Sequence, residues 1–186
     1  MIEKIADDIW KLRANSNIYF LDFKKKILID TGDRAERRIV EQFLSKVVDF
    51  DKVEIVIFTH LHFDHIGNFD LFKKAKFYAS EQAIKDLKRD KKGTVYDEFM
   101  AEKFNAKLKP IPDKIEELEI IKTPGHTRGS ICLWYDKERI LFSGDTMFKT
   151  SPGRKDFPTS SPKKFNKSLM KLVKYNFKIL ASGHDY

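Results

Sequence analysis

Short apolar runs bounded by turn residues recur along this chain and predict β-strands. They cover Ile18–Asp22, Lys26–Ile29, Val53–Phe58, Lys76–Ala79, Glu119–Thr123, Ser130–Tyr135, Arg139–Ser143 and Lys178–Ala181. Segments with apolar residues at helical spacing, or with a Ser or Pro suited to a helix start, predict helices. These are Ala35–Val48, Asn68–Lys74, Ser80–Lys88, Thr94–Asn105 and Ser161–Tyr175. The stretch Thr59–His65 is predicted to be a loop.

The order of these elements predicts an α/β fold. In both halves of the chain, strands first pair as hairpins and then alternate with helices. This order is typical of two mixed β-sheets that face each other with helices outside. The sequence has no repeat, no low-complexity tract and no linker rich in Pro, Gly or Ser, so residues 1–186 are predicted to form a single domain.

The composition is that of an ordinary folded domain. The chain has 186 residues, of which 41% are apolar and 16 are Phe, and this is enough to bury a core. Its longest apolar runs, such as Val53–Phe58, are far too short to span a bilayer, and its first residues lack the apolar core of a signal peptide. The single cysteine, Cys132, cannot form an internal disulfide, and we expect it to pack within a strand. These features favour a cytoplasmic, reducing compartment.

The net charge of +8 comes from lysines spread along the whole chain. Scattered pairs of lysines at turns and on helix faces are usually solvated surface. The alternative is that they steer an anionic substrate or a nucleic acid, although the sequence has no extended basic arm and no stripe of interleaved aromatic and basic residues. We therefore expect a small, anionic substrate and no membrane partner, with nucleic acid as the less favoured partner and the oligomeric state left open.

The histidines carry the chemistry that this sequence suggests. Each of the five follows a predicted strand, where loops from several strands meet at one edge; they are His60, His62, His65, His126 and His184. Three of them, together with Asp64, lie within six consecutive residues. If this loop is extended, His60, His62 and Asp64 point the same way, because side chains alternate along an extended chain. His65 is then turned toward a second site.

A single histidine is more often a core or surface residue than a metal ligand. Three histidines and an aspartate at this spacing, however, arise by chance in roughly one chain in several thousand of this length. Three further strand ends add ligand types in the segments Gly125-His126-Thr127, Gly144-Asp145-Thr146 and Gly183-His184. Their glycines would let the backbone approach an ion closely. The pattern therefore predicts a metal site.

The stretch from Thr59 to Asn68, THLHFDHIGN, resembles the signature of the metallo-β-lactamase superfamily. The resemblance runs from the N-terminal hairpin, with its Asp30-Thr31-Gly32 element, to His184. It implies a four-layer αββα sandwich of two mixed β-sheets with two metal ions at one edge. Carried over to this sequence, it implies a first ion held by His60, His62 and His126, a second held by Asp64, His65 and His184, and Asp145 bridging both.

Imidazole and carboxylate ligands around two divalent ions favour Zn²⁺, with Fe or Mn as alternatives. Two ions about 3.5–4 Å apart share a water whose pKa falls to near 7. The bridging hydroxide would attack an electrophilic carbonyl or phosphorus, and the ions would stabilise the oxyanion that develops. In this interpretation Asp64 is also catalytic, because it orients the hydroxide and can pass a proton to the leaving group. Asp30 is expected to support a ligand loop from behind the metals.

The segment Gly153-Arg154-Lys155-Asp156 resembles a stretch of glyoxalase II-like thioesterases and of persulfide dioxygenases. Arg154 stands nine residues after Asp145, where glyoxalase II has a basic residue that helps bind the glycine carboxylate of glutathione. We therefore predict that Arg154, with Lys149 nearby, binds an anionic part of the substrate. The alternative is that Arg154 and Asp156 only pair to shape the loop.

Two departures from glyoxalase II bear on the substrate. Asp156 stands where glyoxalase II has a tyrosine, two residues after the basic residue, and the helical domain that supplies most glutathione contacts is absent from the sequence. The favoured function is hydrolysis of a thioester or related ester, without an expectation of glutathione specificity.

Other functions remain as alternatives. The first is a mononuclear iron persulfide dioxygenase with the ligands His60, His126 and Asp145, and the second is a phosphodiesterase or ribonuclease of the same fold. Redox flavo-diiron relatives replace the second histidine of the cluster with Glu, so His62 argues against them. A metal-bearing but inactive binding protein is the last alternative, since a fold alone never proves activity.

His184 is third from the end of the sequence, so its position depends on how the last residues are held. We expect the strand Lys178–Ala181 to hold this loop by backbone pairing, and Tyr186 to pack its ring against apolar surface.

Overall fold

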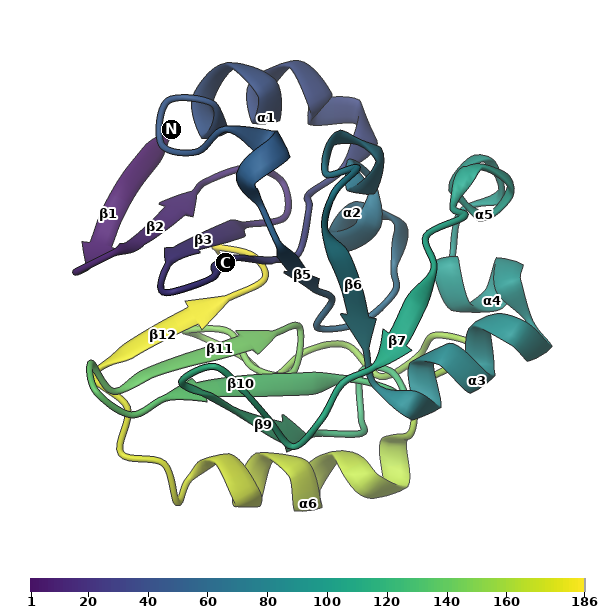
Figure 1. Cartoon of the computed structure of the whole chain (residues 1–186). Coiled ribbons are helices and arrows are strands. Elements are labelled where there is room, and N and C mark those ends of the chain that lie inside the picture. The colour runs from purple at the N-terminus through teal and green to yellow at the C-terminus, as the bar shows by residue number, and fades with distance from the viewer. Residues whose placement is uncertain (186) are drawn as a thin grey trace.

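The computed structural model describes residues 1–185 and consists of two β-sheets packed face to face, with helices on both outer faces (Figure 1). This is the predicted αββα sandwich, so the predicted fold class is confirmed. Tyr186, whose ring we expected to pack against apolar surface, lies outside the described residues. Within residues 1–185, no helix is long and apolar enough to cross a membrane.

The larger sheet has seven strands, hydrogen-bonded in chain order. They are β1 (Ile2–Ala6), β2 (Ile9–Leu12), β3 (Ile18–Asp22), β4 (Lys26–Ile29), β5 (Ile55–Ile57), β6 (Lys76–Ala79) and β7 (Leu108–Pro110). Strands β1 to β4 are antiparallel neighbours, and β4 to β7 are parallel neighbours. Parallel neighbours need long crossovers, and this is why the helices of the first half of the chain lie between β4 and β7 in the sequence.

The smaller sheet has five strands in the order β12-β11-β10-β9-β8. They are β8 (Lys114–Ile115), β9 (Leu118–Lys122), β10 (Ile131–Tyr135), β11 (Ile140–Gly144) and β12 (Ile179–Ser182). Strand β12 pairs in parallel with β11, and the other pairs are antiparallel. Both sheets are therefore mixed, as predicted, and the predicted hairpin of β10 and β11 is present.

The helices cover the two sheets from outside. Helix α1 (Arg37–Leu44) lies over the larger sheet and α6 (Pro162–Leu172) lies against the smaller one (Figure 1). The shorter helices are α2 (Phe63–Ile66), α3 (Glu81–Arg89), α4 (Lys91–Val95) and α5 (Glu98–Lys103), and the 3-10 turns are η1 (Arg34–Glu36), η2 (Phe50–Lys52) and η3 (Phe69–Leu71). The side chain of Ser80 accepts a hydrogen bond from the backbone N–H of Ala83 and so caps α3, as predicted.

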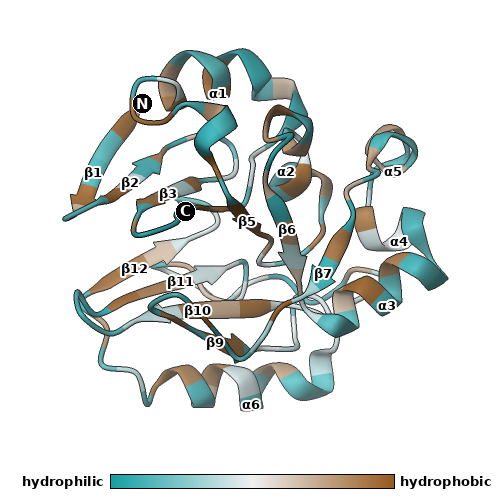
Figure 2. Ribbon diagram, in the orientation of Figure 1, coloured by the Kyte–Doolittle hydropathy of each residue, from teal (hydrophilic) through white to brown (hydrophobic). Residues whose placement is uncertain are grey.

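The alternation of side chains along the strands divides the core into three layers. In β3, Phe20 packs on the helix side of the larger sheet, whereas Tyr19 and Leu21 pack between the sheets. In β10, Leu133 packs between the sheets, whereas Cys132 faces α6 and is buried, as expected. Because each sheet is covered on both faces, its central strands, such as β5 and β10, are buried at every position, whereas outer strands such as β1 also carry hydrophilic residues (Figure 2).

Several predicted elements differ from the structure. The helix predicted over Ala35–Val48 is divided into η1 and the shorter α1, and the helix predicted over Asn68–Lys74 is only the single turn η3. The helix predicted over Thr94–Asn105 is interrupted at Tyr96, which has a left-handed backbone and separates α4 from α5. Strands β1, β2, β7 and β8 were not predicted, because they are short and much of their surface is only partly buried, which leaves a weak hydrophobic signal.

Candidate metal centre

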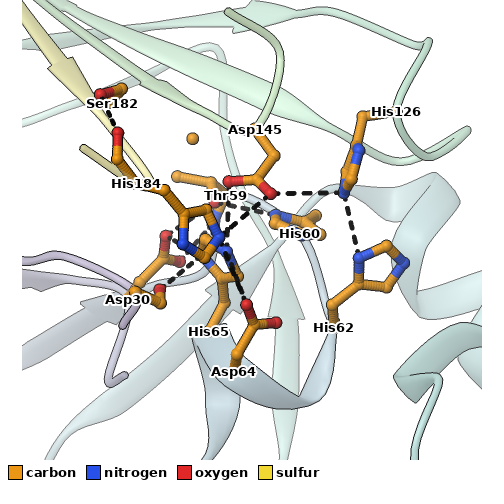
Figure 3. A network of polar contacts seen from close by, with 12 residues as sticks. Asp30, Thr59, His60, His62, Asp64, His65, His126, Asp145, Ser182 and His184 are labelled. Carbon is orange, nitrogen blue, oxygen red and sulfur yellow. Dashed lines mark hydrogen bonds and ion pairs between the residues drawn. The ribbon is translucent and has the colours of Figure 1, made fainter. Parts of the chain in front are cut away.

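All seven predicted ligands lie at one edge of the sandwich, on loops that follow β5, β9, β11 and β12 (Figure 3). Their ligand atoms form three groups, each with atoms within 4.8 Å of one another. The groups are His60, His62 and His126; His60, His65 and Asp145; and Asp64, His65 and His184. The first and third groups are the two ligand sets that the family resemblance implies, and Asp145 lies between them. The function of these residues as metal ligands stays a prediction.

The loop after β5 does not remain extended, which corrects one expectation. His62 still has an extended backbone, with φ −68° and ψ 151°, but it is the N-cap of α2, which begins at Phe63. The helical turn carries Asp64 away from the side of His60 and His62. Asp64 therefore groups with His65 and His184 instead.

Four of the histidine rings are oriented by hydrogen bonds at Nδ1. His65 Nδ1 lies 2.8 Å from the carboxylate of Asp30, and His126 Nδ1 lies 2.8 Å from the backbone oxygen of Arg154. The other two contacts join His60 Nδ1 to the hydroxyl of Thr59 and His184 Nδ1 to the backbone oxygen of Asn15. A neutral ring that donates from Nδ1 presents a lone pair at Nε2.

Asp30 lies behind the loop that carries the histidine cluster and contacts it, and its role in orienting metal ligands stays a prediction. Its carboxylate accepts hydrogen bonds from the backbone N–H of Thr59 at 2.8 Å and from the Thr59 hydroxyl at 2.7 Å. The Thr59 hydroxyl is therefore able to accept from His60 Nδ1. Asp30 is buried and has a positive φ of 59°, a conformation that aspartate tolerates better than most residues.

The buried donor atoms fit a divalent cation. His62 turns its Nδ1 toward Nε2 of His126, 3.0 Å away (Figure 3). Among residues 1–185, the Nε2 atoms of His60 and His65 and the Oδ1 atom of Asp145 are buried without a hydrogen-bond partner. Such orphaned polar atoms are rare in folded proteins and call for an explanation. Imidazole nitrogens and carboxylate oxygens that converge within a few ångströms are the donor set that Zn²⁺ or Fe²⁺ binds.

The pKa values of the histidines are shifted in opposite directions on the two sides of the cluster. Burial lowers the pKa of His62 to about 3, assisted by the nearby His126, and burial lowers the pKa of His60 well below its ordinary value. For His184, burial acts against protonation, but hydrogen bonds to Asp145 and Asp64 outweigh it and raise its pKa to about 9. Binding of a divalent ion on the side of His184 would therefore release protons.

Two glycines allow the close packing of the ligand loops. A Cβ atom at Gly183 would lie 2.1 Å from the carboxylate of Asp145 and 2.8 Å from the ring of His65. A Cβ atom at Gly144, which has a φ of +48°, would lie 2.6 Å from the hydroxyl of Thr59. Any larger residue at these two positions would displace a predicted ligand or its support.

The loop that carries His184 is held on both sides. The Gly183 backbone N–H donates to the carbonyl of Gly144 at 2.8 Å, and its carbonyl accepts from the backbone N–H of Asn17 at 2.7 Å. The carbonyl of Ser182 also accepts from the Tyr19 hydroxyl at 2.7 Å. Together with the pairing of β12 and β11, these bonds tie the segment to both sheets, as predicted from the sequence.

A cavity of about 260 Å³ opens onto this cluster. It is lined by Asn15, His62, Phe63, Asp64, Tyr96, His126, Asp145, Phe148, Arg154, Phe157 and His184. Arg154 makes two hydrogen bonds with Asp156, of 3.0 and 2.7 Å, and its guanidinium lies 4.6 Å from the centre of the Phe157 ring. Lys149 is exposed and does not line the cavity, and its contact with substrate stays a prediction.

Sequence reasoning missed several contacts of the site. Asn15 and Arg154 contribute backbone oxygens, which leave no signal in residue identity. Tyr96 lies at the cavity mouth only because the chain turns left-handed there, in the middle of a segment whose composition predicts a continuous helix. Thr59 directly precedes the histidine cluster in the sequence, and this position could have marked it as a residue of the site. In the structure its hydroxyl donates to Asp30.

Known proteins share this sequence pattern. The model of the metallo-β-lactamase superfamily matches residues 13–184. A protein of Methanocaldococcus jannaschii named as a probable metallo-hydrolase is 38% identical over 155 residues, which cover 78% of this chain and 73% of that protein. The hydroxyacylglutathione hydrolase GloC of Haemophilus influenzae is 27% identical over 186 residues, which cover 92% of this chain and 85% of that protein.

Solved structures share the fold. A protein crystallised in a di-iron-bound form superposes with a TM-score of 0.76 at 22% identity, covering 95% of this chain and 91% of that chain. The BLEG-1 B3 metallo-β-lactamase superposes with a TM-score of 0.71 at 25% identity, covering 100% of this chain and 92% of that chain.

Proposed function

This chain belongs to the metallo-β-lactamase superfamily, and we propose that within it the protein is a two-metal hydrolase of thioesters. The family match, together with relatives named as metallo-hydrolases and hydroxyacylglutathione hydrolases, supports its assignment as a metallo-hydrolase. The observation that carries the proposal of a two-metal site is the completeness of the cluster: residues of both ligand sets line one cavity, and the cluster holds buried donor atoms without a hydrogen-bond partner.

In this proposal His60, His62 and His126 would hold the first ion and Asp64, His65 and His184 would hold the second, and the carboxylate of Asp145 between the two sets would be available to both. The bound ions would activate a water at neutral pH and stabilise the oxyanion of the ester. The donor set favours Zn²⁺, with iron as the alternative; one structural neighbour was crystallised with two irons.

Asp64 is the proposed proton carrier. Its carboxylate lines the cavity and lies 3.3 Å from Nε2 of His184, so both groups would face the second ion. As the water oxygen attacks the carbonyl carbon, Asp64 accepts the water proton. When the carbon–sulfur bond breaks, Asp64 returns this proton to the leaving thiolate. Arg154, also in the cavity lining, is proposed to bind an anionic group of the substrate.

The ligand set supports hydrolysis over the dioxygenase alternative. A mononuclear site made of His60, His126 and Asp145 would leave the second group, which includes His65 and His184, without a function. His65 and His184 are nonetheless buried, and their Nδ1 atoms donate hydrogen bonds to the carboxylate of Asp30 and to the backbone oxygen of Asn15. The likeness to a hydroxyacylglutathione hydrolase over nearly the whole chain supports a thioester as the substrate.

Metal analysis combined with two assays tests the proposal. Protein purified without added metal is analysed for bound ions, then assayed for thioester hydrolysis and for oxygen uptake with a persulfide. About two ions per chain and release of free thiol are expected. One iron per chain with oxygen consumption, and no thiol release, would replace this function with the dioxygenase.

A further inference from the structure

One aromatic residue at the cavity mouth has a backbone conformation that its side chain disfavours. Tyr96 has φ 60° and ψ 25°, in the left-handed region. Within residues 1–185, the other non-glycine residues with positive φ are the turn residues Asp8, Glu116 and Arg139, and Asp30 behind the metal loop. A bulky residue in this region is a true outlier, and such outliers cluster at functional sites.

The chain on both sides fixes the position of Tyr96. Its backbone N–H donates to the carbonyl of Lys92 at 2.8 Å and closes α4. The next residue, Asp97, caps α5 by accepting a hydrogen bond from the N–H of Met100 at 2.7 Å. Glycine or asparagine is the usual residue at such a helix end. Burial does not compensate for the tyrosine, since its side chain is 48% exposed.

The ring of Tyr96 instead faces the metal cluster. Its centre lies 4.9 Å from that of Phe157, edge to face, and 5.9 Å from the ring of His62. Phe157 in turn lies 4.7 Å from His62 and 5.0 Å from His126. The helices α4 and α5 stand beside β7 at one end of the sandwich (Figure 1), and Tyr96 is the residue that joins them.

The cavity lining combines polar and aromatic side chains. Asp64 and Asp145 present carboxylates and Arg154 presents a guanidinium, whereas Tyr96, Phe157, Phe63 and Phe148 present aromatic surface. A volume of about 260 Å³ lies just below the usual range of small-ligand sites. Such a space suits an ester that carries one ring or one branched alkyl group.

We propose that Tyr96 determines substrate specificity, because together with Phe157 it binds an aromatic or branched apolar group next to the scissile bond. This inference rests on the proposed thioesterase function and deepens it. The left-handed backbone at Tyr96 accompanies a ring position 5.9 Å from the ring of His62 and 4.9 Å from that of Phe157.

Two variants separate the ring from the backbone. Tyr96→Asn removes the ring and suits the left-handed conformation, whereas Tyr96→Phe keeps the ring. Phe99→Ala is the matched control, because Phe99 is an exposed aromatic residue on α5 that does not line the cavity. Each metal-loaded protein is assayed with the acetyl and phenylacetyl thioesters of N-acetylcysteamine and with the acetyl thioester of benzyl mercaptan.

For Tyr96→Asn, the preference in kcat/KM for an aromatic ester over the acetyl thioester of N-acetylcysteamine is expected to fall about fivefold, mainly through KM. Tyr96→Phe and Phe99→Ala are expected to keep the preference. The melting temperature of Tyr96→Asn is expected to be unchanged or higher. An equal loss of activity toward all three esters, accompanied by a fall of several degrees in melting temperature, would show that the ring is structural and overturn the proposal.

A binding measurement tests the role of Tyr96 separately from the proposed thioesterase function. Calorimetry with phenylacetate and acetate reports the aromatic preference without turnover. Phenylacetate is expected to bind the wild type more tightly than acetate. In Tyr96→Asn, the ratio of these two affinities is expected to be about fivefold smaller. Failure of the wild type to hydrolyse any thioester would remove the proposed function alone. Equal affinities of wild type and Tyr96→Asn for phenylacetate would remove the inference alone.

Discussion

The carboxylate of Asp30 and the ring of His65 are joined by a hydrogen bond of 2.8 Å between Oδ2 and Nδ1. This contact connects the end of the N-terminal hairpin with the metal loop, across 35 residues of sequence. It directs Nε2 of His65 toward Asp145, whose Oδ1 lies 3.3 Å away. Asp30 therefore acts through His65 and Thr59, and contributes to the orientation of ligands from both groups.

The first prediction concerns this contact. Asp30→Asn keeps the size and tolerates the positive φ, but removes the negative charge and one acceptor oxygen. We expect metal affinity to fall about 10-fold to 100-fold, as is typical when the partner of a ligating histidine is lost. Competition with a chelator of known affinity measures this change. Asp8→Asn, also at positive φ but in the exposed turn between β1 and β2, is the control. Equal affinities of Asp30→Asn and wild type would mean that Asp30 only shapes the loop.

The second prediction concerns Arg154, which the structure pairs with Asp156 on the exposed rim of the cavity. Exposed ion pairs contribute little to stability, so an anionic substrate can compete for the guanidinium. Arg154→Ala is expected to raise KM for a thioester with a carboxylate by about tenfold, the loss of one charge-assisted bond. Asp156→Asn is expected to lower that KM, because it removes the competing carboxylate. Equal effects on a neutral thioester would show that Arg154 and Asp156 serve the loop alone.

The sequence predicted the strands of the core well, because alternation and burial leave a strong pattern in β3, β4 and β10. It failed at elements whose surface stays half exposed, such as β1, and at the helix break of Tyr96. A left-handed residue in a helical segment is a product of tertiary contacts, here with His62 and Phe157, which no local pattern records.

The candidate site, too, could be predicted only in part. Side-chain ligands such as His60 and His126 could be named from their types and from their places after strands. The groups that orient His184 and His126 are the backbone oxygens of Asn15 and Arg154, and any residue type offers such an oxygen. Physical proximity of these segments depends on how the two sheets pack, and therefore became visible only in the structure.

The third prediction concerns stability away from the site. Asp70 accepts hydrogen bonds from Arg34 at 2.6 Å and from Arg37 at 2.7 Å. Partial burial opposes its ionisation, but these two guanidinium groups outweigh that effect and lower its pKa. A lowered pKa means that the stabilisation is fully present above the unfolded-state value near 3.9 and is lost as the pH falls through the folded-state value.

We therefore expect Asp70→Asn to lower the free energy of unfolding by about 1 kcal/mol at pH 7, a figure reduced for solvent screening of a carboxylate that is one-third exposed. The difference between variant and wild type should stay constant down to pH 5 and shrink below pH 4. Urea denaturation at several pH values measures it. Asp113→Asn, at an exposed residue paired only with Lys122, is the control. A difference that persists undiminished at pH 3 would exclude the ion pairs as its cause.

The last prediction concerns His184, whose loop is tied to both sheets by backbone hydrogen bonds of Gly183 and Ser182, in addition to the bond between the His184 side chain and Asn15. His184→Ala should therefore leave the fold intact and empty the second site, so that bound metal falls from about two ions per chain to about one. Thioester hydrolysis should fall at least about a hundredfold, the scale on which a group that stabilises the transition state acts. Plasma emission spectrometry of dialysed protein counts the ions, and circular dichroism verifies the fold.

Two further variants are compared with His184→Ala. Asp185→Ala removes the neighbouring contact with Lys11 but no predicted ligand, so it should keep both ions. His126→Ala should lose the first ion, and the rise in melting temperature on adding Zn²⁺ should shrink in both His variants, because binding to the folded state is what raises it. If His184→Ala keeps its metal content and an oxygen-dependent activity on persulfides while His126→Ala loses both, the second ligand group is not a metal site, and the two-metal hydrolase is replaced by the mononuclear dioxygenase.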